Sequence, residues 1–227
     1  AIAQLSGALS RIAAHRFEPE LNDITLAYFQ QAANLEKDPQ KAAAMRAFAA
    51  NPKDPEDLRV LRSAPYLIGR TATTCVPTMI EGGHAPNALP QRASAVVNCR
   101  VFPGRSFEEI QAELAVVADE PALTITDMSG DETTQAPASP YNPAFVGAFK
   151  RALYGAWGEM PIIPMQASGA SDSMWYRALG VPSYGASSTF MKESDDFSHG
   201  LNERVPINNI RPGLAYYQAL LQDLTSP

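Results

Sequence analysis

The spacing of apolar residues changes between residues 71 and 103, and this change constrains the fold most strongly. TATTCVPTMIEGG and RASAVVNCRVF are rich in β-branched or alternating apolar residues, and the turn-forming GGHAPNALPQ links them. Alternation of this kind is typical of strands that bury one face, and a link rich in Gly, Pro and Asn joins two such strands as an antiparallel pair. The sequence therefore predicts a hairpin with a long loop, centred near Asn87.

The two cysteines of the chain, Cys75 and Cys99, fall about opposite each other in a hairpin with this centre. Opposed residues of antiparallel strands have Cβ atoms roughly 5 Å apart, a separation that a disulfide can bridge. Two small buried apolar side chains would suit the same positions, and we expect this second arrangement. Two cysteines are too few for a disulfide scaffold, and they lack the CxxC spacing of a zinc site.

Helices and a further strand are predicted around the hairpin. Apolar side chains recur at helical spacing from Ile2 to Ile12, and Ser106 and Glu109 form a capping box that begins another helix. ALTITDM, residues 122–128, is typical of a strand. The order strand, strand, helix, strand predicts an α+β domain with helices on one face of an antiparallel sheet.

Two stretches interrupt this pattern. Residues 31–65 are rich in Ala, Lys and Asp and are punctuated by prolines, so we expect short helices in an insertion that carries no chemistry of its own. PASPYNP at 137–143 is typical of a domain boundary. We therefore expect one domain over residues 1–136 and part of a second over residues 137–227.

The second region has the rhythm of an α/β fold. Asn142 and Pro143 begin a helix as its N-cap and first residue, PIIPMQAS and VPSYGAS are typical of short buried strands, and SDSMWYRAL predicts a helix that ends at Gly180. A final helix from about Pro212 is predicted to bury four apolar side chains, which are Leu214, Tyr217, Leu221 and Leu224. About 90 residues are few for a complete α/β sheet, so we expect half a domain.

Composition excludes two classes of partner. The net charge of −6 and the pI near 5.1 argue against nucleic-acid binding, which needs clustered Lys and Arg. With 45% hydrophobic residues and no apolar run near the roughly 18 residues that cross a bilayer, we expect a folded, soluble protein without a membrane segment. The chain begins without Met or a signal segment, so we expect a mature form or a fragment, and its compartment is open between cytoplasmic and exported.

His199, in DDFSHGLNERVPINN, is one of three histidines. It follows a predicted strand and lies in a polar loop, where α/β folds bind ligands. A metal site needs two or three more ligands, and the nearby Asp195, Asp196 and Glu203 are of a kind that solvent usually surrounds. From the residues alone, a metal ligand and a polar loop histidine both remain open.

The chain offers two further candidates. QASGASDSM offers serines for a Ser-His-Asp triad, but it lacks the G-x-S-x-G elbow, and Asp172 more simply caps the helix that begins at Ser173. Arg100 shares a strand face with Val and Phe residues, so it is either a solvent-exposed rim residue or a clamp for a carboxylate.

Three stretches in order resemble one family. EGGHAPNALPQRASAVVNCRVFPG resembles the lid-domain hairpin of the zinc peptidases that include carboxypeptidase S, aminoacylases and succinyl-diaminopimelate desuccinylase. ASGASDSMWYRALGVPSYG resembles the family's (S)GG-x-SD segment, and HGLNERVPINNI resembles its C-terminal metal-ligand motif. The opening AIAQLSGALSRIA is similar to the family's first lid helix, and the middle of the chain to the insertion of the carboxypeptidase S branch.

This resemblance implies a hydrolase with an α/β catalytic domain that holds two zinc ions. Its lid is a four-stranded sheet with two helices and often dimerises. The expected reaction is hydrolysis of an amide next to a free carboxylate, in a peptide or an N-acyl amino acid. The family's H-x-D motif, bridging Asp and Glu-Glu pair have no counterpart here, since Glu108-Glu109 belongs to the capping box.

We therefore expect the N-terminal half of the protein, including the first lid strand and the general base, to lie outside this chain. The chain alone should then be inactive, and the alternative is a non-catalytic dimerisation or binding module. The resemblance implies that His199 is a zinc ligand and that Glu203 orients it. It implies substrate contacts for four residues, which are Asn87, Arg100, Gly169 and Ser171.

Overall fold

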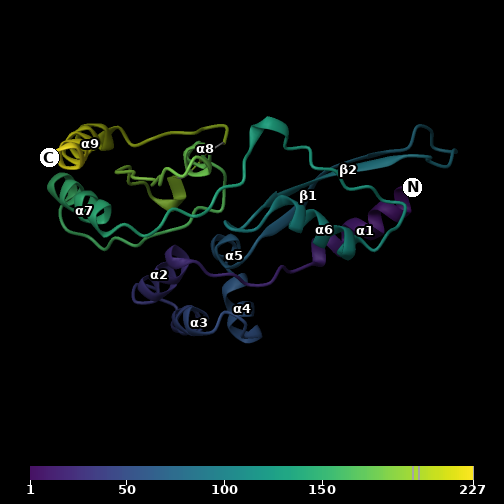
Figure 1. The fold of residues 1–227 in the computed structure, drawn as a ribbon, viewed down its shortest axis with the longest axis horizontal. Coiled ribbons are helices and arrows are strands. Elements are labelled where there is room, and N and C mark those ends of the chain that lie inside the picture. Colours follow the sequence, from purple (N-terminus) through teal and green to yellow (C-terminus); the bar gives the residue numbers. More distant parts are fainter. Residues whose placement is uncertain (196, 199, 227) are drawn as a thin grey trace. The chain divides into compact units, whose positions relative to one another are not determined.

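The computed structural model describes residues 1–195, 197–198 and 200–226 (Figure 1). The chain divides into two compact units. The first combines residues 1–139 with residues 163–183, and the second combines residues 140–162 with the chain from Tyr184 onward. The domain limits expected from the sequence, 1–136 and 137–227, stay a prediction.

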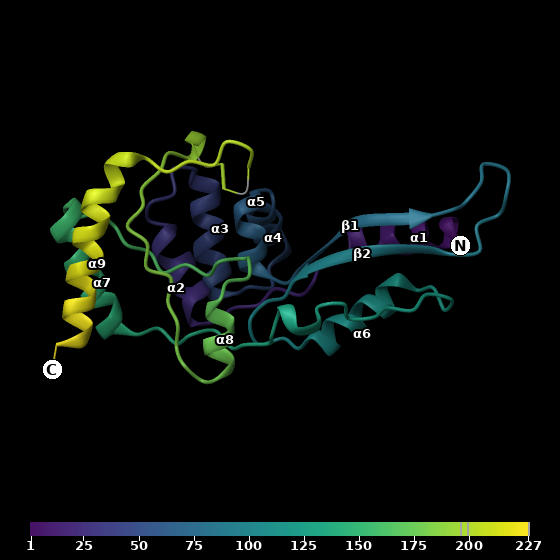
Figure 2. The ribbon, with the colours of Figure 1, turned by 90° about the horizontal axis from the view of Figure 1, so that it is seen from above.

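The predicted hairpin is confirmed. Strand β1 (Thr74–Gly82) pairs antiparallel with β2 (Ala93–Arg100), from Thr74 opposite Arg100 to Gly82 opposite Ala93, with an irregularity between Pro77 and Met79. Helices α1 (Ile2–Ala14) and α6 (Phe107–Ala118) lie on the same side of the hairpin (Figures 1 and 2). The expected fold class, an antiparallel sheet with helices on one face beside α/β elements, is confirmed.

One apolar cluster holds α1, α6 and the hairpin together. Ala8, Ile12, Ile110 and Leu114 are buried, and the inward-facing side chains of both strands pack against them. The capping box of α6 forms as predicted: Ser106 accepts from the Glu109 backbone at 3.1 Å, and the Glu109 side chain accepts from the Ser106 backbone at 2.9 Å. Helix caps of this kind contribute about 1 kcal/mol.

The strand expected over residues 122–128 is not formed. Within the described residues the sheet has two strands, and residues 123–129 pair with neither. Leu123 and Ile125 nevertheless pack against the α1–α6 cluster, whereas Thr124 and Thr126 are exposed. The alternation thus sets the direction of the side chains, but a strand also needs a neighbour that completes its hydrogen-bond ladder.

The interpretation of the cysteines as two separate apolar side chains is wrong. Cys75 and Cys99 are directly opposite in the hairpin and form a disulfide, with S–S 2.02 Å and Cα–Cα 4.1 Å. Both residues are half-buried against the α1–α6 cluster. The predicted pairing of Cys75 with Cys99 is correct. The alternation of apolar residues predicted only that both side chains would be buried, but the pairing also brings the two sulfur atoms into bonding range.

A polar cluster joins α1 to α6. Arg105 contacts Glu113 at 2.9 Å, Glu109 at 3.4 Å and Glu20 at 3.6 Å, and Glu113 also meets Nε2 of His15 at 2.8 Å. Burial raises the pKa of Glu20, and the charge of Arg105 offsets only part of that rise. Burial would also raise the pKa of Glu113, but hydrogen bonds from His15 and Arg105 outweigh it and lower that pKa.

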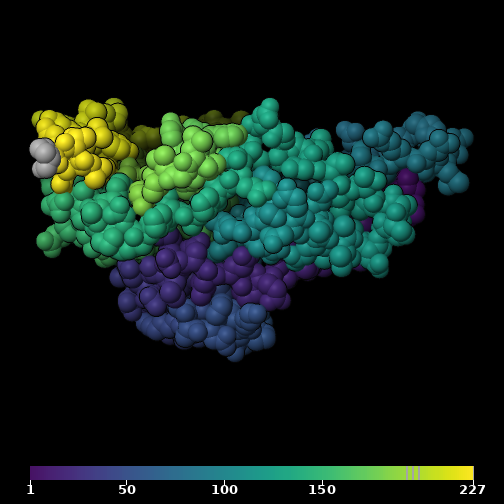
Figure 3. Space-filling model, viewed as in Figure 1, coloured from purple at the N-terminus to yellow at the C-terminus, as the bar shows by residue number. Residues whose placement is uncertain are grey.

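The short helices predicted over residues 31–65 are confirmed as part of a four-helix subdomain over residues 23–71, which we call the insertion. Its helices are α2 (Asp23–Ala32), α3 (Pro39–Ala50), α4 (Pro55–Arg62) and α5 (Pro65–Thr71). Asn22, Asp38 and Asp54 cap the first three of them through their side chains. Phe29 and Phe48 are fully buried at its centre, with their rings edge to face at 4.7 Å. Figure 3 shows the surface of this subdomain in dark purple and blue.

The second unit is built on two helices, α7 (Pro143–Trp157) and α9 (Ile210–Thr225). Asn142 caps α7 as predicted, accepting from Phe145 N at 3.1 Å. The predicted buried stripe of α9 is wrong, because α9 turns Tyr216 and Leu220 toward the small residues of α7 instead. Four apolar residues of α9 are therefore 46–68% exposed, and these are Leu214, Tyr217, Leu221 and Leu224.

The remaining elements are short. Helix α8 (Ser173–Ala178) belongs to the first unit and ends before Gly180, whose φ of +80° suits glycine, as predicted. Single 3-10 turns occupy η1 (Gly130–Glu132), η2 (Glu193–Asp195) and η3 (Ile207–Asn209). The strands expected from PIIPMQAS and VPSYGAS are not formed within the described chain, because short apolar runs need neighbouring strands to pair with.

Across the described part of the chain, no helix combines the length and the apolar character that a membrane crossing requires.

The disulfide generates a first prediction. Reduction should lower the free energy of unfolding of the first unit by about 3 to 4 kcal/mol, because the bond closes a long loop in the unfolded chain. Chemical denaturation with and without reductant measures the difference. The Cys75→Ala/Cys99→Ala double variant is the control, because reductant should leave it unchanged. Equal midpoints for the oxidised and reduced protein would contradict the prediction.

The polar cluster generates a second prediction, in which the same substitution has opposite effects at two glutamates. At pH 7, Glu20→Gln should leave stability unchanged or increase it, because a raised folded-state pKa means that ionised Glu20 costs stability above that pKa. Glu113→Gln should destabilise by about 1 to 3 kcal/mol through the loss of charge-assisted hydrogen bonds. The stabilisation from Glu113 should disappear as the pH falls through its lowered pKa. Urea denaturation checks both variants, and effects of the same sign would refute the assignment.

Candidate functional site

Gly169 and Ser171 lie in an exposed loop of the first unit, between residues 163–168 and α8. A Cβ added at Gly169 would meet no atom within 4 Å, so space remains beside this backbone. The carbonyl oxygen of Ser171 accepts from Met174 N at 3.0 Å, which ties the loop to the start of α8. The two residues predicted to line a pocket are therefore separated by one residue, accessible, and close to the start of a helix.

The cap predicted for Asp172 is wrong. Its side chain makes no capping hydrogen bond, and its backbone has φ −56° and ψ −18°. A side-chain cap requires an extended backbone, because the carboxylate must fold back over the first turn. The Asp172 carbonyl oxygen accepts from Trp175 N at 3.2 Å instead.

Arg100 and Asn87 lie at opposite ends of the hairpin. Arg100 ends β2 opposite the first residue of β1, whereas Asn87 is in the loop of residues 83–92 that joins the strands. The eight residues of β2 alone span about 26 Å at roughly 3.3 Å per residue. Both side chains are exposed, and Arg100 has no ion pair within the described residues. One hairpin cannot bring both side chains to the same small substrate.

His199 lies outside the described residues, but contacts between described residues join the segments that precede and follow it. Asn209 is buried and holds Phe190 by two hydrogen bonds, from Phe190 N at 3.2 Å and to Phe190 O at 2.8 Å. Further in, Arg204 pairs with Asp195 at 2.8 Å and covers the ring of Phe197, with Cζ 4.5 Å from the centroid. Two sets of contacts, Asn209 with Phe190 and Arg204 with Asp195, thus join the segments before and after His199. The sequence alone did not predict either of them.

Glu203 is exposed and has no side-chain partner among the residues described. Its predicted role beside His199 therefore rests on sequence alone. The four residues predicted to contact substrate, Asn87, Arg100, Gly169 and Ser171, all belong to the first unit.

The described residues do not form a metal site by themselves. Among them, no group of three or more His, Cys, Asp or Glu side chains is arranged to hold an ion. A single histidine supplies one of the three or four protein ligands that zinc takes. A metal bound through His199 would therefore need further ligands.

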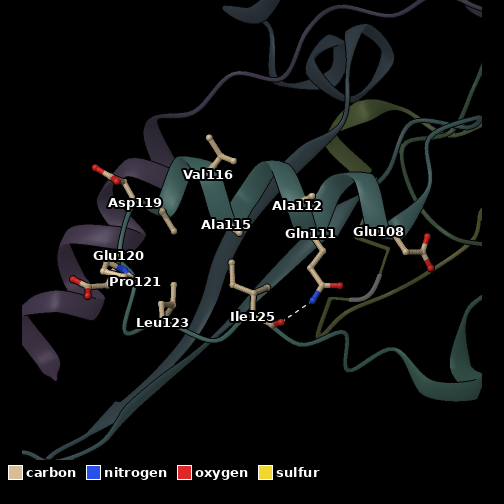
Figure 4. Close-up of a pocket in the computed structure, with 11 residues that line it drawn as sticks. Glu108, Gln111, Ala112, Ala115, Val116, Asp119, Glu120, Pro121, Leu123 and Ile125 are labelled. Atoms are coloured by element: carbon tan, nitrogen blue, oxygen red, sulfur yellow. Dashed lines mark hydrogen bonds between the residues drawn. The ribbon is translucent and has the colours of Figure 1, made fainter.

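An open groove lies between α6 and residues 119–125, and Figure 4 shows its lining. Its floor is apolar, with Ala115, Leu123 and Ile125, and Gln111 Nε2 donates to Ile125 O at 2.6 Å across it. None of the predicted site residues lines this groove. We therefore assign it no part in the candidate site.

Comparison with known proteins identifies the family. A family model described as "Peptidase dimerisation domain", of the M20 peptidases, matches residues 1–126. The chain belongs to the M20 peptidase family. The resemblance found in the sequence is thereby confirmed, and the matched region contains α1, the insertion, the disulfide hairpin and α6.

Curated relatives cover most of the chain but only part of their own length. "Probable carboxypeptidase S-like 1" of Dictyostelium discoideum is 26% identical over 168 residues, which are 71% of this chain and 33% of that protein. "N-fatty-acyl-amino acid synthase/hydrolase PM20D1" of Xenopus tropicalis is 26% identical, over 73% and 32%. "Aminoacylase-1" of Mus musculus is 29% identical, over 73% and 40%. The chain thus spans about a third of the length of these relatives.

A solved structure shares the fold. It is described as an M20 family metallo-carboxypeptidase, Sso-CP2, from Sulfolobus solfataricus, and it superposes with a TM-score of 0.63 at 15% identity. The superposition covers 97% of this chain and 51% of that one. Both units of the chain therefore have counterparts in an M20 fold.

Proposed function

We propose that this chain is part of a metal-dependent hydrolase that cleaves an amide bond next to a free carboxylate. The substrate is a peptide or an N-acyl amino acid, and the metal is zinc, as two ions. The observation that carries the proposal is the family match over residues 1–126, supported by a fold likeness that extends over 97% of the chain. The further metal ligands and the general base would come from an N-terminal half of the same protein, outside this chain.

The exposed face of α9 supports a larger catalytic domain. Leu214, Leu221 and their apolar neighbours form a continuous stripe along the helix that no described residue covers. Exposed apolar stripes of this length usually mark a surface that another element covers. We propose residues 1–136 as the lid domain and residues 137–227 as the closing part of an α/β catalytic domain.

The residues of this chain would bind and orient the substrate. Arg100 has the planar donor fork that suits a carboxylate, and no described acid occupies it. Asn87 would hydrogen-bond near the scissile group, and Gly169 and Ser171 would line the pocket through backbone and hydroxyl contacts. No residue of the chain is assigned the hydrolytic step itself.

A second copy of the lid accounts for the separation of Arg100 and Asn87. Because one hairpin cannot present both side chains to one substrate, the two contacts would come from two copies or serve two sites. The family model names a dimerisation domain, so we propose a homodimer through the lid. The alternative function, a dimerisation or binding module without catalysis, predicts the same assembly but no bound metal.

Metal content tests the proposal. In the full-length protein, His199→Asn should lower the bound zinc by about one ion, because the loss of a ligand side chain weakens zinc binding. Hydrolysis of N-acyl amino acids should be abolished with it, because the proposed reaction depends on the metal. His84→Asn, in the exposed hairpin loop, is the matched control and should retain both. Elemental analysis and a hydrolysis assay on the same samples give the result. A protein that binds no metal, or His199→Asn that keeps full metal content, would contradict the proposal.

A further inference from the structure

Residues 163–168 connect the helical insertion to the predicted substrate loop. This segment directly precedes Gly169, yet it packs on helices that lie more than ninety positions earlier in the chain. Ile163 packs against the insertion core around Phe29 and Phe48. The insertion and the loop are therefore parts of the same compact unit.

Asn22 makes the second connection. Its Oδ1 accepts from Ile24 N at 3.1 Å and Thr25 N at 3.0 Å, as the cap of α2. The cap fixes the orientation of the amide and directs Nδ2 outward, where it donates to Oε1 of Gln166 at 2.6 Å. The same side chain thus begins the insertion and holds the segment before the loop.

Arg70 makes the third connection. Its Nη1 donates to the Tyr28 hydroxyl at 2.7 Å, and Cζ lies 4.6 Å from the centroid of that ring. Its Nη2 meets Sδ of Met165 at 2.7 Å. A guanidinium held by a hydrogen bond and a cation–π contact has little freedom. Met165 therefore rests on a fixed support.

Gly69 makes the closest approach. A Cβ at this position would lie 2.5 Å from Cβ of Ser168 and 3.8 Å from its Cα. Gly69 lies within α5, so the glycine is needed for space rather than for an unusual backbone angle. Any side chain there must displace Ser168, the residue bonded to Gly169.

The far side of the loop is also held. Arg177 of α8 donates through Nε to Pro137 O at 3.0 Å, and Gly180 N bonds to Arg177 O at 2.9 Å. The loop from Gly169 to Asp172 thus lies between two anchored segments, residues 163–168 and α8. A displacement of Ser168 should therefore also displace Gly169 and Ser171, because few residues lie between Ser168 and the anchored helix α8.

We propose that the insertion is a positioning device for the substrate site, with Gly69 and Arg70 as positioning residues for the loop of Gly169 and Ser171. This inference rests on the proposed function, since it takes the loop to contact substrate. The insertion still carries no chemistry of its own, but it gains an indirect role in binding. The insertion acts on binding through residues 163–168, without touching the substrate.

The test uses a steric change and its relief in the full-length protein. Gly69→Ala should raise KM for an N-acyl amino acid about fivefold or more and keep kcat within about twofold, because the loop binds ground state and transition state alike. Ser168→Gly removes the atom that the new methyl meets. The double variant should therefore return to within about twofold of Ser168→Gly alone, as expected for coupled neighbours.

Gly7→Ala is the matched control, because a Cβ there meets its nearest atom at an ordinary 3.6 Å. Hydrogen exchange of residues 163–172 is measured on the same proteins. Exchange should accelerate in Gly69→Ala and recover in the double variant. Unchanged KM and exchange in Gly69→Ala, or losses that persist in the double variant, would overturn the proposal.

Hydrogen exchange also distinguishes a failure of the proposed hydrolase function from a failure of the positioning role of the insertion. If the unsubstituted protein hydrolyses none of the substrates tested, the proposed function fails, and the exchange pattern alone decides whether the insertion positions the loop. If the protein is active and Gly69→Ala behaves like Gly7→Ala, the proposed function stands and the positioning role is wrong.

Discussion

The contact between the insertion and residues 163–168 is the constraint on which the first unit depends. It joins a helical subdomain near the start of the chain to a segment that follows α7, and so makes one compact body of two distant stretches. Each participating residue has a local task as well: Asn22 caps α2, and Gly69 lies within α5. Weakening the contact would therefore disturb the loop of Gly169 and the insertion together.

The part of the first unit formed by α1, α6 and the hairpin uses different interactions for different tasks. Apolar packing of α1 and α6 covers one face of the hairpin, the disulfide joins the hairpin where it meets this cluster, and Arg105 links three glutamates at the rim. Apolar burial supplies most of the stabilisation, at roughly 25 cal/mol per Å². Within the charged cluster the two glutamates act in opposite directions: burial makes ionised Glu20 unfavourable, whereas hydrogen bonds from His15 and Arg105 stabilise ionised Glu113.

Local signals predicted the local elements well. The caps at Ser106 and Asn142, the helix end at Gly180 and the register that sets Cys75 opposite Cys99 all follow from neighbouring residues. Features that depend on distant residues were missed. The buried face of α9 is set by its fit to small residues of α7, and the strand expected at 122–128 needs a partner outside its own sequence. For the site, sequence motifs named the candidate residues, but no local signal marks Gly69 or Gln166 as their support.

A double-mutant cycle at Asn22 and Gln166 tests the central contact most directly. The free energy of unfolding in urea is measured for each alanine variant and for the double variant. Asn22→Ala removes the α2 cap whether or not Gln166 is also replaced, so this loss cancels in the cycle. A coupling free energy of about 1 kcal/mol is expected for a hydrogen bond between two amides. A coupling indistinguishable from zero would mean that the Asn22–Gln166 hydrogen bond does not hold residues 163–168 on the insertion, and it would contradict the account at its most specific contact.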